Sequence, residues 1–320
     1  MPRPRAFTRR PRPRAPRAPR VVVVGDLMLD VVLAPAMSLQ DGTDVPGRVS
    51  LRQGGSAAST ARWLARLGAR STLVCAIGRD PEGRALVRAI EADGVRIRAS
   101  RVAGERTGRV GVLVSPGGER SFVTDRGAAD SLRAVDLPAS TFDADLVHLP
   151  VYTLIGESLA VAGRRAIELG REAGALVSLD LASVGPLLSG GRAAAVRLVR
   201  DAAPDILFAT AGEADAILGG RDPSRLAELA PLVVVKRGRG GASVLTREGG
   251  RRVVFDVATS PLDAPDTTGA GDAFDAGFLM SWLSADADER ARPTALRRAV
   301  LAANRAASRQ LALPRKELSL

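Results

Sequence analysis

The stretch "DAPDTTGAGDAFDAGF", Asp263–Phe278, places a Gly-Ala-Gly tripeptide between two pairs of carboxylates. The segment after the tripeptide, "DAFDAGFLMSWL", carries apolar side chains at helical spacing, which predicts a helix that begins at the glycines. Glycine and alanine leave their backbone amides uncovered, and the free amides at a helix N-terminus attract an anion. The stretch therefore predicts a backbone cradle that suits a phosphoryl group.

Asp272 should occupy the first turn of that helix, beside the cradle. A carboxylate in this position can accept the proton of an attacking hydroxyl group. Phosphoryl transfer asks a protein for little more than a positioned nucleophile and stabilised charge on the moving group. As a pattern alone, the string also fits an ordinary turn in which Asp272 complements the helix dipole.

The rest of the chain alternates predicted strands and helices. "VVVVG" at 21–25 and "STLVCAIG" at 71–78 are short apolar runs typical of buried strands, and "GGSAASTARWLARLGAR" at 54–70 between them has helical periodicity. The alternation continues through "PDILFATAGEADAILG" and "LVVVKRGRGGASVL". This rhythm predicts an α/β fold, doubly wound, with a mostly parallel sheet flanked by helices.

Two segments break the rhythm. "RVGVLVSPGGERSFVTDRG", 109–127, alternates with period two around a Pro-Gly-Gly turn, which predicts an antiparallel hairpin. Together with residues 31–53 it could form a small β-sheet that stands off the main layer. The pattern leaves three interpretations open, namely a lid over a ligand site, an edge extension of the central sheet and a dimer contact.

The charge of the 320-residue chain is concentrated at its N-terminus. The net charge is +11, but residues 1–20 hold eight arginines and no acid, so the remaining 38 basic and 35 acidic residues give only +3. We expect residues 1–19 to be a disordered Arg/Pro-rich tail, with at most a weak attraction to nucleic acid. The nearly neutral body argues against a nucleic-acid-binding domain.

Several protein classes are disfavoured. No apolar run reaches the ~20 residues that span a bilayer, so we expect no membrane association. The single cysteine, Cys75, cannot form an internal disulfide and favours a cytoplasmic protein. The string G-x-x-x-x-G-K-[ST] is absent, which excludes a P-loop NTPase, and no Cys/His cluster suggests a zinc site.

The longer string "DTTGAGDAF", 266–274, resembles the C-terminal signature of the ribokinase (PfkB) family of sugar and nucleoside kinases. Residues 54–69, "GGSAASTARWLARLGA", are similar to the N-terminal Gly-Gly signature of the same family. The segments 77–95 and 107–128 also resemble family segments, so the resemblance covers most of residues 20–310. It implies a ribokinase-like kinase domain over residues 20–320, with a small β-sheet lid drawn from about 31–53 and 97–126.

The resemblance assigns roles at the second signature. Asp272 would be the general base that deprotonates a substrate hydroxyl attacking the γ-phosphate of ATP, with Gly269, Ala270 and Gly271 as the anion hole.

Asp266 and Thr268 match positions that hold a monovalent cation in many family members, and K⁺ is the candidate ion. A structural role for Asp266, in which its side chain caps the turn, is an equally open interpretation.

The resemblance also assigns a sugar-binding end. Asp30, in "VVVVGDLMLD", falls where family members grip sugar hydroxyls, and Gly54 and Gly55 would bring backbone close to the sugar. Ser59 stands where the family often has a sugar-contacting asparagine, and His148 lies at a strand end where some relatives contact substrate.

Two nearby residues remain open. Tyr152 is an alternative to His148 as the substrate contact, and both could instead pack at the strand end. Asp26 could share the role of Asp30, although a solvated loop acid is the favoured interpretation.

The predicted nucleotide site comes from the strand and loop "VVVKRGRGGA". Lys236, Gly238 and Gly241 match family positions under the adenosine phosphates. Thr210 replaces the asparagine of the family's Asn-x-x-Glu motif, while Glu213 is retained and could act on Mg²⁺ through water. Magnesium would arrive with ATP and be held mainly by phosphates and water.

The sequence therefore predicts an ATP- and Mg²⁺-dependent kinase that phosphorylates a hydroxymethyl group of a small ribose- or ketohexose-like sugar. One alternative is a nucleoside kinase of the adenosine type, which the departures at Ser59 and His148 permit. A second is a catalytically weak ligand-binding or regulatory protein. Family lids often pair edge to edge, so a cytoplasmic homodimer is expected.

Overall fold

The computed structural model describes residues 17–320 except for residues 116, 118, 221, 249, 265 and 314. The prediction of a disordered tail over residues 1–19 therefore lies mostly outside the described residues. Two of its last three residues contact the body: Arg17 pairs with Asp145 at 2.5 Å, and the Pro19 carbonyl accepts the Arg70 N–H at 2.8 Å.

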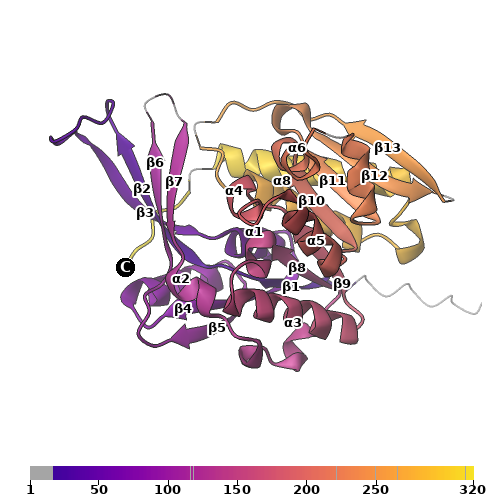
Figure 1. The fold of residues 1–320 in the computed structure, drawn as a ribbon, viewed down its shortest axis with the longest axis horizontal. Coiled ribbons are helices and arrows are strands. Elements are labelled where there is room, and N and C mark those ends of the chain that lie inside the picture. Colours follow the sequence, from indigo (N-terminus) through magenta and orange to yellow (C-terminus); the bar gives the residue numbers. More distant parts are fainter. Residues whose placement is uncertain are drawn as a thin grey trace, which may run out of the picture.

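A nine-stranded sheet forms the centre of the molecule, in the order β13-β12-β11-β10-β9-β8-β1-β4-β5 (Figure 1). The strands from β11 to β5 pair in parallel, while β12 and β13 add an antiparallel edge. This arrangement confirms the predicted fold class. The strands are β1 (Arg20–Val24), β4 (Arg70–Gly78), β5 (Arg96–Val102), β8 (Leu146–Pro150), β9 (Leu176–Asp180), β10 (Ile206–Thr210), β11 (Leu232–Lys236), β12 (Ala242–Glu248) and β13 (Arg251–Val257).

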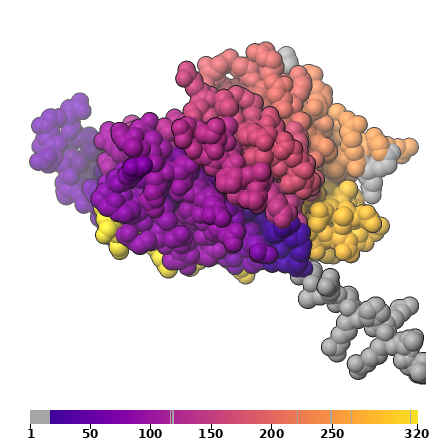
Figure 2. All heavy atoms as spheres, turned by 90° about the horizontal axis from the view of Figure 1, so that it is seen from below, coloured from indigo at the N-terminus to yellow at the C-terminus, as the bar shows by residue number. Residues whose placement is uncertain are grey.

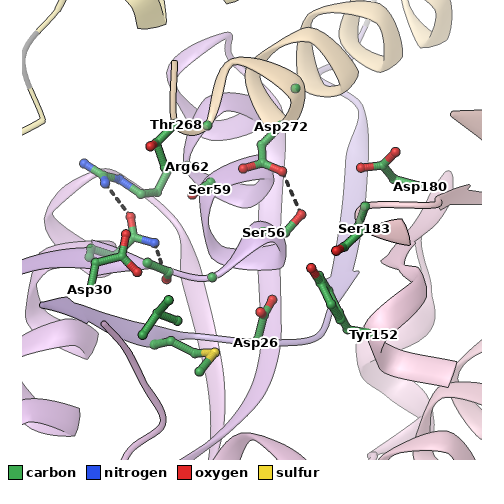
Figure 3. Close-up of a pocket in the computed structure, with 18 of the residues that line it drawn as sticks. Asp26, Asp30, Ser56, Ser59, Arg62, Tyr152, Asp180, Ser183, Thr268 and Asp272 are labelled. Carbon is green, nitrogen blue, oxygen red and sulfur yellow. Dashed lines mark hydrogen bonds between the residues drawn. The ribbon is translucent and has the colours of Figure 1, made fainter. Parts of the chain in front are cut away.

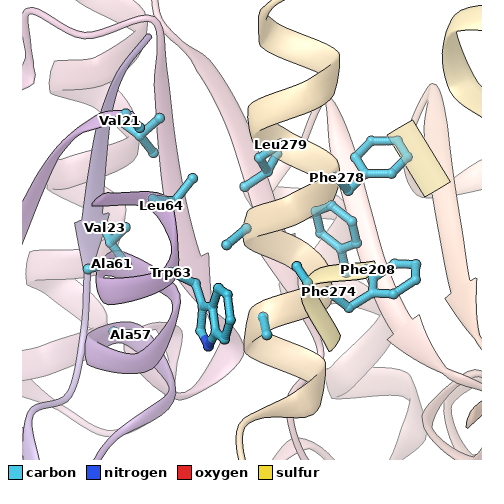
Figure 4. Packing of buried hydrophobic residues seen from close by; sticks show 14 of the residues in the cluster. Val21, Val23, Ala57, Ala61, Trp63, Leu64, Phe208, Phe274, Phe278 and Leu279 are labelled. Atoms are coloured by element: carbon cyan, nitrogen blue, oxygen red, sulfur yellow. The ribbon is translucent and has the colours of Figure 1, made fainter. Parts of the chain in front are cut away.

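Helices cover both faces of this sheet, which explains the continuous apolar run of β1. Successive side chains point to opposite faces, so Val21 and Val23 pack in one cluster while Val22 and Val24 pack in the other. The first cluster lies under α1 (Ser56–Arg66), α2 (Pro81–Ala92), α7 (Ala270–Leu283) and α8 (Pro293–Ala312) (Figure 4). The second lies under α3 (Ser158–Glu172), α4 (Val184–Leu187), α5 (Arg192–Ala202) and α6 (Ala211–Leu218).

Four strands form a separate small sheet, called the small sheet below, in the order β3-β2-β6-β7. Its strands project beyond the rounded body (Figures 1 and 2). They are β2 (Met28–Pro35), β3 (Gly47–Gly54), β6 (Arg109–Val114) and β7 (Arg120–Asp125).

The small sheet includes the predicted hairpin, because β6 and β7 pair antiparallel. The predicted range 97–126 was too wide at its start. Residues 96–102 form β5, which pairs in parallel with β4 at the edge of the main sheet. The apolar positions of β5 pack on the main core, where Ile97 and Ala99 contact the α1 side.

No helix among the described residues is long and apolar enough to cross a membrane.

The contact between α7 and α8 depends on Gly277. A Cβ at this position would lie 2.8 Å from the Ala306 Cβ and 2.9 Å from the Ala302 carbonyl oxygen. Both are small or backbone groups with no room to yield. The two helix backbones therefore approach as closely as they do only because residue 277 has no side chain.

We predict that Gly277→Ala lowers the free energy of unfolding by about 1–3 kcal/mol, because the added methyl overpacks the helix contact. Chemical denaturation followed by circular dichroism would measure the change. Gly212→Ala on α6 is the matched control, since a Cβ there meets no atom within 4 Å. Equal stability of the two variants would contradict the packing argument.

Candidate active site

A cleft of about 1110 Å³ lies at the carboxyl ends of the central strands. Its walls come from the small sheet, from α1, from the N-terminus of α7 and from the end of α8. In open α/β sheets ligands bind beyond the carboxyl ends of the strands, so this is the expected place for a site.

The N-terminus of α7 opens into the cleft. Gly269 is its N-cap residue, with φ +77°, and no side chain caps the helix. The Ala270 N–H bonds to the Thr267 carbonyl at 3.2 Å and closes the preceding turn. Among the described residues, the N–H groups of Gly269, Gly271 and Asp272 have no hydrogen-bond partner, so they are the amides free to bind an anion. Within the predicted anion hole, 269–271, the Ala270 N–H is the one that is already bonded.

Asp272 lies in the first turn of α7 and faces the cleft. Its Oδ1 accepts a hydrogen bond from the Ser56 hydroxyl at 2.7 Å, as Figure 3 shows. Burial raises the pKa of Asp272 to about 7; the Ser56 hydrogen bond and Lys236 work against this, and Asp180 adds to it. A carboxylate with this pKa is suited to accept a proton near neutral pH.

Lys236, at the end of β11, lies between two carboxylates. Its Nζ donates to Asp180 Oδ1 at 2.9 Å and to both carboxylate oxygens of Asp275 at 3.2 Å. Burial alone would lower the pKa of Lys236, but Asp180 and Asp275 raise it above its ordinary value, so the ammonium stays charged. A Cβ on Gly271 would lie 3.5 Å from this ammonium, which places the charge beside the free amides.

Thr210 and Glu213 form a capping box at the start of α6. The Glu213 N–H donates to Thr210 Oγ1 at 3.2 Å, and the Thr210 N–H donates to Glu213 Oε2 at 2.7 Å. Both residues line the cleft. Burial, reinforced by Asp180, raises the pKa of Glu213. The threonine that departs from the family motif thus has a definite structural role here.

The two glycines of the predicted nucleotide loop lie after β11 and outside the cleft lining. Gly238 adopts φ +52° and is exposed, so its role in nucleotide binding stays a prediction. Position 241 requires glycine for a structural reason. The residue has φ +83°, and a Cβ there would lie 2.1 Å from the Val257 carbonyl oxygen.

Asp30 lies on β2 at the opposite end of the cleft, and it is already paired. Arg315, from the segment after α8, donates to Asp30 Oδ2 at 2.5 Å. Burial raises the pKa of Asp30 and Arg315 opposes the rise. A Cβ on Gly54 would lie 1.9 Å from Asp30 Oδ1, and Gly55 adopts φ +96° against the Asp26 backbone. These two glycines therefore bring the backbone against Asp30 and Asp26.

Ser59 and Arg62 extend the same wall along α1. Asp26 is 4 % exposed, so the expectation of a solvated loop acid was wrong. Its Oδ1 accepts the Ala57 N–H at 3.1 Å, which caps the first turn of α1. Tyr152 lines the cleft with the Arg126 guanidinium 5.3 Å above its ring.

His148 does not contact the cleft, which corrects the prediction of a substrate contact. It is fully buried in β8, between β1 and β9, and its Nδ1 lies 2.8 Å from the Ser178 hydroxyl. Burial lowers its pKa to about 4. The residue stands two positions before the end of a central strand, so both sides of it are covered.

At the predicted monovalent-cation site, Asp266 is already paired, while the role of the buried Thr268 hydroxyl in cation binding stays a prediction. Three guanidinium groups surround the Asp266 carboxylate: Arg120 at 3.2 Å, Arg315 at 3.2 Å and Arg52 at 3.4 Å. They satisfy the carboxylate and repel a further cation. Asp266 Oδ1 also accepts the Thr268 N–H at 2.9 Å, so the turn-capping interpretation is the one that the geometry favours.

Sequence reasoning missed several residues of the site. Asp180 ends a buried strand, "LVSLD". A carboxylate at the carboxyl end of a parallel strand indicates a site residue, because ligands bind beyond these strand ends. Asp275 lies within the opening motif, but nothing local shows that it faces Lys236. Ser56 and Arg315 are found only through contacts with residues more than 200 positions away in the chain.

No group of three or more His, Cys, Asp or Glu side chains within the described residues forms a metal-binding cluster. The acidic side chains at the nucleotide end, Asp180 and Glu213, are accessible from the cleft and fit a magnesium ion that is held chiefly by phosphates and water.

The doubly wound sheet with its small second sheet and its open helix N-terminus defines a ribokinase-like kinase. A solved adenosine kinase from Sinorhizobium meliloti is similar over 94% of this chain and 96% of its own, with a TM-score of 0.79 and 26% identity. The chain belongs to the pfkB family of carbohydrate kinases, whose model matches residues 18–313.

Two curated relatives are similar over most of their length. An ATP-dependent ribose-1-phosphate kinase from Halopiger xanaduensis is 32% identical over 290 residues, covering 85% of this chain and 88% of the relative. Fructokinase-2 from Solanum habrochaites is 30% identical over 276 residues, which cover 81% of this chain and 80% of the relative. The chain is therefore a sugar or nucleoside kinase by family.

On the expected role of Asp272 as general base, we predict that kcat/KM rises with pH through about 7 and is constant above it, because only an ionised carboxylate accepts a proton. Ser56→Ala removes a hydrogen bond that lowers the pKa of Asp272, so the midpoint should move to higher pH. Ser284→Ala at the other end of α7 is the control. An unchanged midpoint in Ser56→Ala would contradict this geometry.

Proposed function

We propose that this chain transfers the γ-phosphoryl group of ATP to a hydroxymethyl group of a small ribose- or ketohexose-like sugar. The observation that supports it best is the position of Asp272, which is hydrogen-bonded to Ser56 and lies beside the free amides at the start of α7. An acceptor hydroxyl beside Asp272 and a phosphoryl group on the amides would meet at one point.

In the proposed step, the carboxylate of Asp272 takes the proton of the acceptor hydroxyl. The oxygen of that hydroxyl forms a bond to the γ-phosphorus of ATP. The bond from that phosphorus to the bridging oxygen breaks, and ADP leaves. The Gly271 and Asp272 amides and the Lys236 ammonium stabilise the negative charge on the moving group. Magnesium, which would lie near Asp180 and Glu213 when bound, would supply further positive charge.

The small sheet serves as the lid in this proposal. Three observations support the role: the sheet lines one side of the cleft, it projects from the body, and Arg52 and Arg120 tie it to Asp266. The proposed domain assignment is a kinase domain over residues 20–320 with this lid. The exposed apolar side chain of Val123 on this sheet, 77 % exposed, also suits the expected homodimer.

Asp272→Asn should lower kcat by about 100-fold or more, because the base is lost while the amide cradle stays. The affinity for ATP, measured by isothermal titration calorimetry, should change little. Phosphoryl transfer would be followed by coupled ADP detection on a panel of free sugars, sugar acids, sugar phosphates and nucleosides.

Asp275→Asn is not a suitable control, because it disrupts the buried pair with Lys236; Asp263→Asn, an exposed carboxylate in the same motif, is the matched one. Near-full activity of Asp272→Asn would contradict the role of the base. A preference for nucleosides would favour the adenosine-type alternative, and no turnover on the panel would favour a ligand-binding protein.

A further inference from the structure

The acceptor end of the cleft is strongly basic, although the body of the chain is nearly neutral. Five basic side chains line the part of the cleft between α1, α8 and the segment after α8, and we call them the basic cluster: Arg62, Arg66, Arg309, Arg315 and Lys316. Three carboxylates line the neighbouring part of the cleft, namely Asp26, Asp30 and Asp272. Basic residues therefore outnumber acidic ones where the sugar is proposed to bind.

Ion pairs compensate this charge only in part. Arg62 and Arg66 share one carboxylate, Asp93, which lies behind the cleft wall. Arg315 pairs with Asp30 and with Asp266.

The carboxylate of Asp266 is in turn shared with two arginines of the small sheet. Arg309 and Lys316 have no ion-pair partner in the part of the chain that the structure describes. The cluster thus keeps an excess of positive charge that an anion would neutralise.

The cluster lies on the far side of Asp272 from the nucleotide end. In Figure 3, Asp272 stands between Asp180 on one side and Arg62 with Asp30 on the other. ATP phosphates on Lys236 and the α7 amides would therefore not occupy it. The anion that fits is part of the acceptor.

Ser56 and Arg62 place the reacting end and the basic cluster in one cleft. Ser56 contacts Asp272, and Arg62, which follows on the same helix, lines the same cleft. In Figure 3, Arg62 lies on the side of Asp272 away from Asp180.

The backbone of α8 at position 309 is fixed relative to α1 and to the loop before α7. The neighbouring Gln310 donates to the Thr268 carbonyl at 3.0 Å and accepts the Trp63 indole N–H at 2.9 Å. These bonds join α8 to α1 and to the loop before α7. Arg309 thereby borders the cleft at a fixed place relative to Asp272.

We propose that the acceptor is an anionic sugar, with a phosphate or carboxylate group bound by the basic cluster while its hydroxymethyl group reaches Asp272. This rests on the proposed kinase function and names its substrate class. Arginine binds both anions through paired N–H donors, so the two share one recognition chemistry. Asp30, held by Arg315, then accepts hydroxyl groups of the same sugar.

The test compares matched acceptors that differ in the anionic group: ribose with ribose 1-phosphate, fructose with fructose 6-phosphate, and sorbitol with gluconate. We expect kcat/KM to be about 100-fold higher for at least one anionic member than for its neutral partner, since charged hydrogen bonds are lost in the latter. A preference for the two sugar phosphates would show that the cluster binds phosphate, and a preference for gluconate would show that it binds carboxylate. Higher kcat/KM for neutral sugars or for adenosine would overturn the proposal and leave the kinase function intact.

Arg309→Gln is the decisive variant, because its side chain is exposed and makes no internal ion pair whose loss would disturb folding. It should raise KM for the preferred anionic acceptor about 10-fold and leave KM for ATP unchanged. Arg305→Gln, one turn earlier on α8, exposed and outside the cleft, is the matched control. Equal KM values in the two variants would overturn the proposal.

Binding measured without turnover separates this inference from the proposed function. If no acceptor is phosphorylated, the proposed function fails, and calorimetric titration of the same pairs without ATP still tests the cluster. Tighter binding of fructose 6-phosphate than of fructose, weakened by Arg309→Gln and by added salt, would support the anion site. Equal binding of every pair would overturn it.

Discussion

The buried ammonium of Lys236 is the contact on which the geometry of the site depends. It joins Asp180 at the end of β9 and Asp275 inside α7 to the end of β11. Removing one partner of such a buried pair leaves a charge without compensation, at a cost of about 3–5 kcal/mol. The N-terminus of α7 is therefore fixed above the strand ends, and Asp272, one turn before Asp275, is fixed with it.

The remaining contacts extend this constraint to the rest of the cleft. Ser56 holds the Asp272 carboxylate from α1, and Gln310 ties α8 to α1 and to the loop before α7. Asp266 gathers arginines from the small sheet and from the segment after α8. In the proposed reaction, a carboxylate held by this many rigid elements would need little rearrangement when charge develops on the phosphoryl group.

The two ends of the cleft differ in how their charges are balanced. At one end, Asp180 and Asp275 hold the Lys236 ammonium beside the free amides of α7. At the other end, Arg309 and Lys316 line the cleft with no carboxylate partner among the described residues. The ion pairs fix the position of one positive charge, while the cations without a partner leave charge that a ligand of opposite charge would neutralise.

The sequence by itself determined the elements whose signals are local. The strand and helix periodicities, the β6–β7 hairpin and the uncapped helix N-terminus at Gly269 are all set by residues close in the chain, so the sequence predicted them. Only the tertiary structure decided what depends on distant partners. It buried His148 in a central strand, placed arginines around Asp266 and brought Arg315 to Asp30, because strand order and helix packing, not local sequence, bring these groups together.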